Sequence, residues 1–305
     1  LEMWHAIALL VVHGLAGVVL GPASQLLIHD IVGSQHLQSA VRLIATGRHL
    51  GFLAGPAVGG ALLLIFGPAW GIILNILVYL PLTLWLWRAP YGPKFRDQEL
   101  ERGRPVKGFS DIIETVRAIS GDRTIVSMIL LSGAASFMVG SGHTSQLPEY
   151  SLALGHADGL FYSLLFGANA AGAFCAGIVL ESWNMLAPRP RTSVILVCLW
   201  SMAIGAFALT RDYPVALALL FIAGFLNLSY NSMAQSLVQL NSPAAIRGRV
   251  IGLYAMARNG LQAFSGVTIG MVGGVIGIHT SLALSAVILL VMALSLMPMT
   301  KRVVA

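Results

Sequence analysis

Residues 124–142 read TIVSMILLSGAASFMVGSG, a stretch of nineteen residues without a charged side chain. A helix of about 18 or more such residues is long enough to cross the hydrocarbon core of a membrane. The apolar residues cover most of the helical circumference and do not alternate with polar ones, as they would in the strands of an outer-membrane barrel. The stretch therefore predicts a membrane-spanning helix.

The rest of the chain repeats this pattern. Of its 305 residues 57% are hydrophobic and only 10% are charged, which is far from the composition of water-soluble domains. The sequence thus predicts an all-α, polytopic membrane helix bundle embedded in a lipid bilayer. We expect about nine transmembrane helices, near residues 4–27, 49–66, 69–87, 124–142, 159–180, 192–209, 213–237, 250–275 and 277–297. Cys175 and Cys198 both fall inside these spans, which argues against a disulfide framework or a thiolate metal site.

Basic residues are concentrated on one side of the expected bundle. If the spans are threaded in order, seventeen of the eighteen Lys and Arg residues fall on one side and only Arg211 falls on the other. Cytoplasmic loops carry such an excess, so we expect the rich side, with the C-terminus, to face the cytoplasm. The basic residues lie at span ends without interleaved aromatic residues, so a nucleic-acid partner is not expected.

The longest polar interval, residues 88–123, separates three expected spans from six. Near its end, apolar residues between Phe109 and Ile119 recur at helical spacing opposite charged ones. This pattern predicts a short amphipathic helix along the cytoplasmic interface. The alternative is a solvated connector that makes no contact with the membrane.

A glycine-rich motif interrupts the second expected span, where residues 51–60 read GFLAGPAVGG. Gly51, Gly55 and Gly59 form a ridge of small residues at four-residue spacing, widened by Gly60, that would let two membrane helices approach closely. Pro56 should kink the helix. On spacing alone, the motif indicates only a tight contact between helices.

This motif resembles the G-x-x-x-G-P-x-x-G-G motif in the fifth span of antiporters of the major facilitator superfamily. Leu15–Trp87 is similar to spans four to six of that superfamily's branch of siderophore and multidrug exporters, and SPAAIRGRVIGLYAMARNG at 242–260 resembles its loop between spans ten and eleven. The resemblance implies efflux of a small amphipathic solute such as a drug or siderophore across a bacterial inner membrane, by alternating access.

The same resemblance gives a domain organisation in which the family's first three spans are missing. Residues 1–87 would be the second half of an N-terminal bundle, 88–123 a cytoplasmic linker and 124–305 a C-terminal six-helix bundle. Coupling to protons is implied by the resemblance alone, because the first span carries His5 and His13 but not the arginine common in the family's fourth span.

Enzymatic activity is not expected, because the spans contain no HExxH or GxSxG motif and no close pair of carboxylates. No cofactor or metal is expected either. A non-transporting membrane receptor or assembly subunit, or an inactive transporter fragment, is the alternative to an exporter.

Polar side chains inside spans are the candidates for a solute cavity, because burying them in hydrocarbon is costly. They are His13, Asn75, Asn169, Asn227, Tyr230, Asn231, Gln235 and Gln262. Asn227, Asn231 and Gln235 share one helical face, so we expect this face to line the cavity. The alternative is that these amides join neighbouring helices. His13 could carry a proton near mid-span, or serve as a hydrogen-bonded packing residue.

Two arginines, Arg48 and Arg258, are candidates for a gate on the cytoplasmic side. Arg258 is the only charged residue well inside an expected span. The alternative for Arg258 is a side chain that extends along the helix to reach the interface.

Overall fold

The structure, a computed structural model, describes residues 3–91, 109–140, 142–155, 159–183 and 188–300. For some residues in the helices, most of them in α1 and α10, it describes the backbone alone. Every regular element within these described residues is helical, which confirms the all-α fold. The elements are α1 (Met3–Arg88), α2 (Phe109–Ile119), α3 (Arg123–Met138), α4 (Gly142–Ser145), α5 (Leu147–Ala153), α6 (Gly159–Trp183), α7 (Pro190–Leu209), α8 (Tyr213–Asn241), η1 (Ala244–Ile246), α9 (Arg247–Ala255), η2 (Met256–Gly260), α10 (Leu261–Ile276), α11 (Ile278–Leu296) and η3 (Met297–Thr300).

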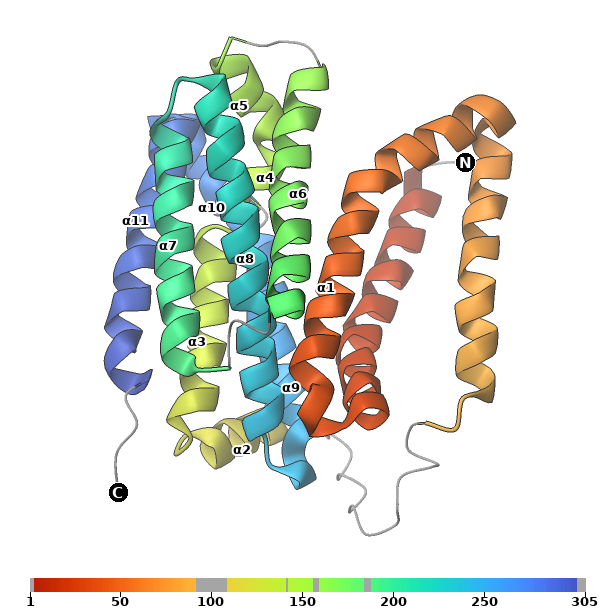
Figure 1. Cartoon of the computed structure of the whole chain (residues 1–305), viewed down its shortest axis with the longest axis vertical. Coiled ribbons are helices and arrows are strands. Elements are labelled where there is room, and N and C mark those ends of the chain that lie inside the picture. Colours follow the sequence, from red (N-terminus) through yellow and green to blue (C-terminus); the bar gives the residue numbers. More distant parts are fainter. Residues whose placement is uncertain (1–2, 92–108, 141, 156–158, 184–187, 301–305) are drawn as a thin grey trace.

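Helix α1 folds back on itself. A straight helix of its 86 residues would be about 129 Å long, whereas Figure 1 shows α1 turning back to run alongside its own earlier part. The backbone leaves helical geometry at Gly33, where φ is 69°, a value that glycine adopts without the steric cost of a Cβ. The region for which three spans are expected is therefore a single helix that folds back on itself.

The remaining long helices form a bundle beside α1 (Figure 1). Within it α6 packs on α8, and α7 packs on both α8 and α11. Its core is continuous and includes the fully buried side chains of Tyr150, Trp200, Phe207 and Tyr254. Helix α1 contacts this bundle through α6, α8 and α9.

Glycines set the closest helix contacts. A Cβ added to Gly172 of α6 would overlap the carbonyl oxygen of Phe221 in α8, and one added to Gly224 of α8 would overlap that of Asn169 in α6. Small residues permit such close backbone approach in membrane bundles, where helices gain most from packing. A third such glycine is Gly177 of α6, where an added Cβ would overlap the side chain of Thr46 in α1.

Five helical segments of the described residues are long and apolar enough to cross a membrane: Arg123–Ser145, Phe161–Leu180, Pro190–Leu209, Tyr213–Asn241 and Ile278–Thr300. Large apolar side chains such as Leu130, Leu199 and Val291 point outward from them and are 44–60% exposed. An outer surface of this kind suits lipid, so the polytopic membrane bundle is confirmed. The total of about nine spans stays a prediction.

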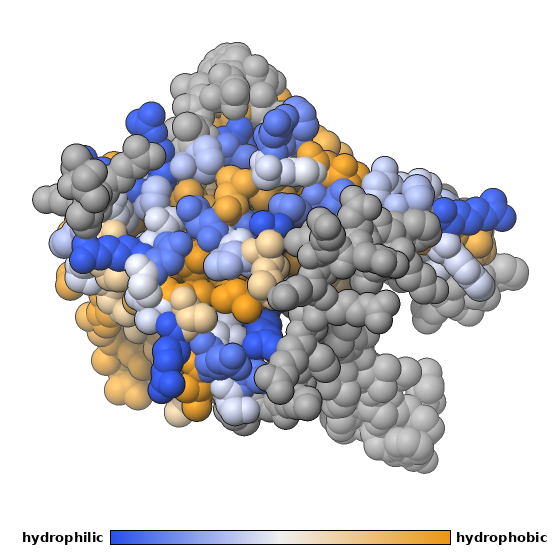
Figure 2. All heavy atoms as spheres, turned by 90° about the horizontal axis from the view of Figure 1, so that it is seen from below, coloured by the Kyte–Doolittle hydropathy of each residue, from blue (hydrophilic) through white to orange (hydrophobic). Residues whose placement is uncertain are grey.

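One end of the molecule, formed by α2, η1, α9 and the C-terminal end of α11, is here called the basic end (Figure 1). Seen from this end, the molecule presents many hydrophilic side chains (Figure 2). The predicted helix near residues 109–119 is confirmed as α2, and Arg249 of α9 forms an ion pair of 3.7 Å with Glu114 on α2. Contact of α2 with a membrane stays a prediction.

Candidate functional site: a polar pocket between α1 and α8

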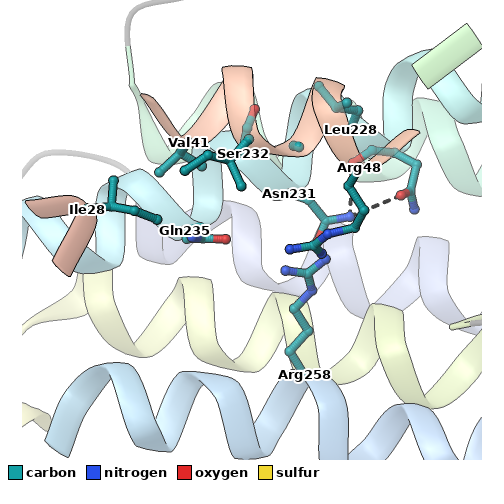
Figure 3. A pocket seen from close by; sticks show the side chains of 11 residues that line it. Ile28, Val41, Arg48, Leu228, Asn231, Ser232, Gln235 and Arg258 are labelled. Carbon is teal, nitrogen blue, oxygen red and sulfur yellow. Dashed lines mark hydrogen bonds between the residues drawn. The ribbon is translucent and has the colours of Figure 1, made fainter. Parts of the chain in front are cut away.

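A pocket lies between α1, α8 and the turn η2, with about 490 Å³ of empty space that includes space open to solvent. Figure 3 shows the side chains that surround it. Its lining combines apolar side chains, most of them from α1, with amides from α8 and a guanidinium group from each of α1 and η2. The residues are Ile28, Val41, Ile44, Ala45, Arg48, Asn227, Leu228, Asn231, Ser232, Gln235 and Arg258.

The three amides predicted to share a face do so. Asn227, Asn231 and Gln235 stand one turn apart along α8 and all line the pocket. Asn231 Nδ2 donates to Asn227 Oδ1 at 3.1 Å and to the Asn227 carbonyl oxygen at 3.0 Å. These bonds stay within α8. The other amide atom, Asn231 Oδ1, is buried and accepts no hydrogen bond within the part of the chain that the structure describes.

The two predicted gate arginines meet in the same pocket. Arg48 extends from α1 and Arg258 from η2, and their guanidinium groups point toward each other (Figure 3). Arg258 lies at the centre of η2, a single turn of π-helix between α9 and α10. Such turns insert an extra residue into an α-helix and recur at functional sites.

Other predicted cavity residues lie elsewhere. Tyr230 is 3% exposed and its ring packs on Trp200, with centroids 5.4 Å apart. Asn169 Nδ2 lies 3.3 Å from His143 Nε2, inside the bundle. Neither of these two candidates lines this pocket, and Gln262 does not line it either. The side chains of His13 and Asn75 lie outside the described residues.

Among the residues of the glycine motif, the structure describes the surroundings of Gly51 and Gly55, and neither contacts a described side chain of another helix. A Cβ added to Gly51 or Gly55 would meet no described atom within 4 Å, so the tight contact predicted for these two residues is not found among the described side chains and stays a prediction. Pro56, Gly59 and Gly60 follow the course of α1, and their surroundings lie outside the described part. The close contacts form at Gly172, Gly177 and Gly224 instead, because those glycines face another helix.

Sequence reasoning missed a set of contacts that join α1 to the C-terminal helices near the basic end. Gln239 of α8 donates to Gln25 Oε1 at 3.2 Å, one turn beyond Gln235. Arg247 Nη1 lies 3.1 Å from His29 Nε2. These residues fall in or next to expected spans, and periodicity alone does not reveal which partner each one meets.

Two buried side chains were also missed. Arg42, only 3% exposed, donates from Nη1 to the Leu180 carbonyl oxygen at 2.8 Å. This arginine falls between the expected spans 4–27 and 49–66, where only a loop was predicted. His143 is 5% exposed and lies in the bundle beside Trp200, although it falls between the expected spans 124–142 and 159–180.

The pocket has the chemistry of a binding site. It offers amides, guanidinium groups and apolar walls to a molecule that is polar on one side and apolar on the other. Among the described residues, no group of three or more His, Cys, Asp or Glu side chains is placed to hold a metal ion.

A bundle of apolar helices with a polar pocket against a second helical unit defines a polytopic membrane protein of the all-α class. Residues 2–266 match the family model of the Major Facilitator Superfamily. The chain belongs to this superfamily, whose members are transporters rather than enzymes.

Similar curated proteins are exporters by name. The chain is 24% identical over 248 residues to the enterobactin exporter EntS of Shigella boydii serotype 18, and equally to that of Escherichia coli O139:H28. The match covers 80% of this chain and 56% of each relative. The chain thus spans little more than half the length of the curated relatives it matches.

Proposed function

We propose that this protein exports a small amphipathic solute across a bacterial inner membrane and that the pocket between α1 and α8 is part of the solute path. The proposal rests on the hydrogen bonds of Asn231. Its amide bonds within its own helix and leaves a buried acceptor, Oδ1, at the pocket. An amide that served only to join helices would place its hydrogen bonds across the interface.

The movement we propose is alternating access, in which α1 and the C-terminal helices rock against each other around the pocket. The contacts at the basic end support this idea. Gln25 with Gln239 and His29 with Arg247 are pairs of polar side chains between the two units. Hydrogen bonds of this kind contribute about 1 kcal/mol each, so they can break and re-form as the pocket opens toward that end.

The basic end is proposed to face the cytoplasm, since basic residues concentrate there. A proton gradient is proposed as the driving force because the glycine motif resembles that of antiporters in the superfamily and the relatives are exporters by name. The rival function is a membrane receptor or assembly subunit that binds the same solute without moving it.

Inverted membrane vesicles that carry the protein test the proposal. We expect energised vesicles to accumulate dansyl-labelled amphipathic probes faster than vesicles without the protein, and an ionophore that collapses the proton gradient to abolish the difference. Accumulation that persists after collapse would overturn proton coupling but keep transport. Saturable binding of the probes without accumulation would favour the receptor.

A further inference from the structure

The pocket contains two like charges. Arg48 and Arg258 direct their guanidinium groups toward each other from α1 and η2 (Figure 3). No Asp or Glu is present among the residues that line the pocket. Two guanidinium groups brought together repel, and the repulsion grows where protein and lipid lower the dielectric constant. An anion between them would turn this repulsion into attraction on both sides.

The chemistry of the two side chains suits such an anion. A guanidinium group is a planar fork of N–H donors that binds carboxylate or phosphate oxygens in pairs. The π-helical turn η2 carries Arg258 on the side of the C-terminal helices, opposite Arg48 of α1. An anion held by both arginines would therefore contact both sides of the pocket at once.

The neighbouring amides refine the description of the ligand. Asn231 Oδ1 is a buried acceptor at the same pocket, so it requires a donor. Ile28, Val41 and Ile44 add an apolar wall from α1. The complementary molecule has an anionic group, an N–H or O–H close to it, and an apolar body.

We propose that Arg48 and Arg258 bind the anionic group of the transported solute, so that the solute class is an amphipathic anion with an adjacent hydrogen-bond donor. This inference rests on the proposed function and adds the charge of the solute. An anionic lipid headgroup has the same chemistry and is the competing source of the anion.

Three matched probes test whether the pocket prefers an anionic ligand. Dansylglycine carries a carboxylate beside a sulfonamide N–H, dansylglycinamide is its neutral amide, and dansylcadaverine is cationic. Binding is measured by fluorescence polarisation with the full chain in nanodiscs of zwitterionic lipid. The variants are Arg258→Gln, Arg258→Lys and, as a control of the same type, Arg191→Gln, whose arginine is exposed on α7 and does not line the pocket.

We expect the wild type to prefer dansylglycine. Arg258→Gln should weaken dansylglycine binding about tenfold or more, because it removes a charge-assisted hydrogen bond, and should change dansylglycinamide binding less than about twofold. Arg258→Lys should retain part of the preference, and Arg191→Gln should retain all of it.

Three results would overturn the inference, and they separate it from the proposed function. Equal binding of the three probes, lost together in Asn231→Ala, would keep a solute pocket but remove the anionic class. Loss of dansylglycine binding in nanodiscs that contain phosphatidylglycerol would assign the arginines to a lipid headgroup. Binding of none of the probes, with no accumulation in vesicles, would overturn both proposals.

Discussion

Gly177 of α6 lies so close to Thr46 of α1 that a Cβ on the glycine would overlap the threonine side chain. This contact joins the folded-back helix α1 to the C-terminal bundle. It lies in the interface that also contains the pocket, because Ala45, next to Thr46, is one of the residues that line it. The way these two units fit together therefore depends on a glycine at one position.

Gly177→Val should push α1 away from α6. Overpacking of this kind costs about 1–3 kcal/mol, so we expect a lower melting temperature in detergent. The matched control is Gly167→Val in the same helix, where an added Cβ would meet no described atom within 4 Å. Equal melting temperatures for the two variants would show that α6 does not approach α1 at Gly177.

Arg42→Ala should destabilise the protein although the residue was expected in a polar loop. Arg42 donates to the carbonyl of Leu180 in the last turn of α6, where backbone acceptors lack partners within the helix and a cation is favourable. We expect a loss of about 2 kcal/mol in the free energy of unfolding. Denaturant unfolding measures it.

The control for Arg42 is Arg191→Ala, which removes an exposed arginine and should change stability by less than about 0.5 kcal/mol. A loss of the same small size in Arg42→Ala would contradict the buried hydrogen bond.

Gly55→Ala tests the glycine motif. Because no described atom lies within 4 Å of an added Cβ at this position and alanine is the better helix former by about 1 kcal/mol, the substitution should not lower the melting temperature and should raise it slightly. Gly224→Ala is the contrasting variant, since its Cβ would overlap the Asn169 carbonyl. If Gly55→Ala proved as damaging as Gly224→Ala, another helix would have to pack on the motif.

The orientation in the membrane can be tested with two cysteines in a chain whose Cys175 and Cys198 are replaced by serine. Arg191 is one of the seventeen basic residues expected on the cytoplasmic side, and Arg211 is the one expected on the other side. We therefore expect Arg211→Cys to react with a membrane-impermeant maleimide in intact cells, and Arg191→Cys to react only after permeabilisation. Labelling of Arg191→Cys in intact cells would reverse the proposed topology.

The helices could be predicted from the sequence because long apolar stretches have few stable forms in lipid. The shared face of Asn227, Asn231 and Gln235 could also be predicted, since helical geometry alone places residues four apart on one side. Both predictions depend on local periodicity, which a single sequence contains.

Contacts between distant helices could not be predicted in this way. The spacing of Gly51 and Gly55 indicates a ridge for close contact but not whether a helix packs there, and the close contacts instead involve Gly172, Gly177 and Gly224. Likewise, nothing in the local sequence pairs Arg42 with Leu180, which is 138 positions away. Such partners depend on how the helices assemble.

The central claim is that the amide face of α8 lines a solute path, and Asn231→Ala tests it most directly. Its matched control is Asn241→Ala, because Asn241 also donates from Nδ2 to the carbonyl four residues earlier, at 2.8 Å, but does not line the pocket. Vesicle transport of the dansyl probes and the melting temperature are measured on the same preparations of both variants.

We expect Asn231→Ala to change the apparent affinity for the probes or their order of preference, with a melting temperature close to that of Asn241→Ala. A lower melting temperature in Asn231→Ala with an unaltered order of preference would contradict the account, because it would show that the amide stabilises the bundle and does not contact the solute.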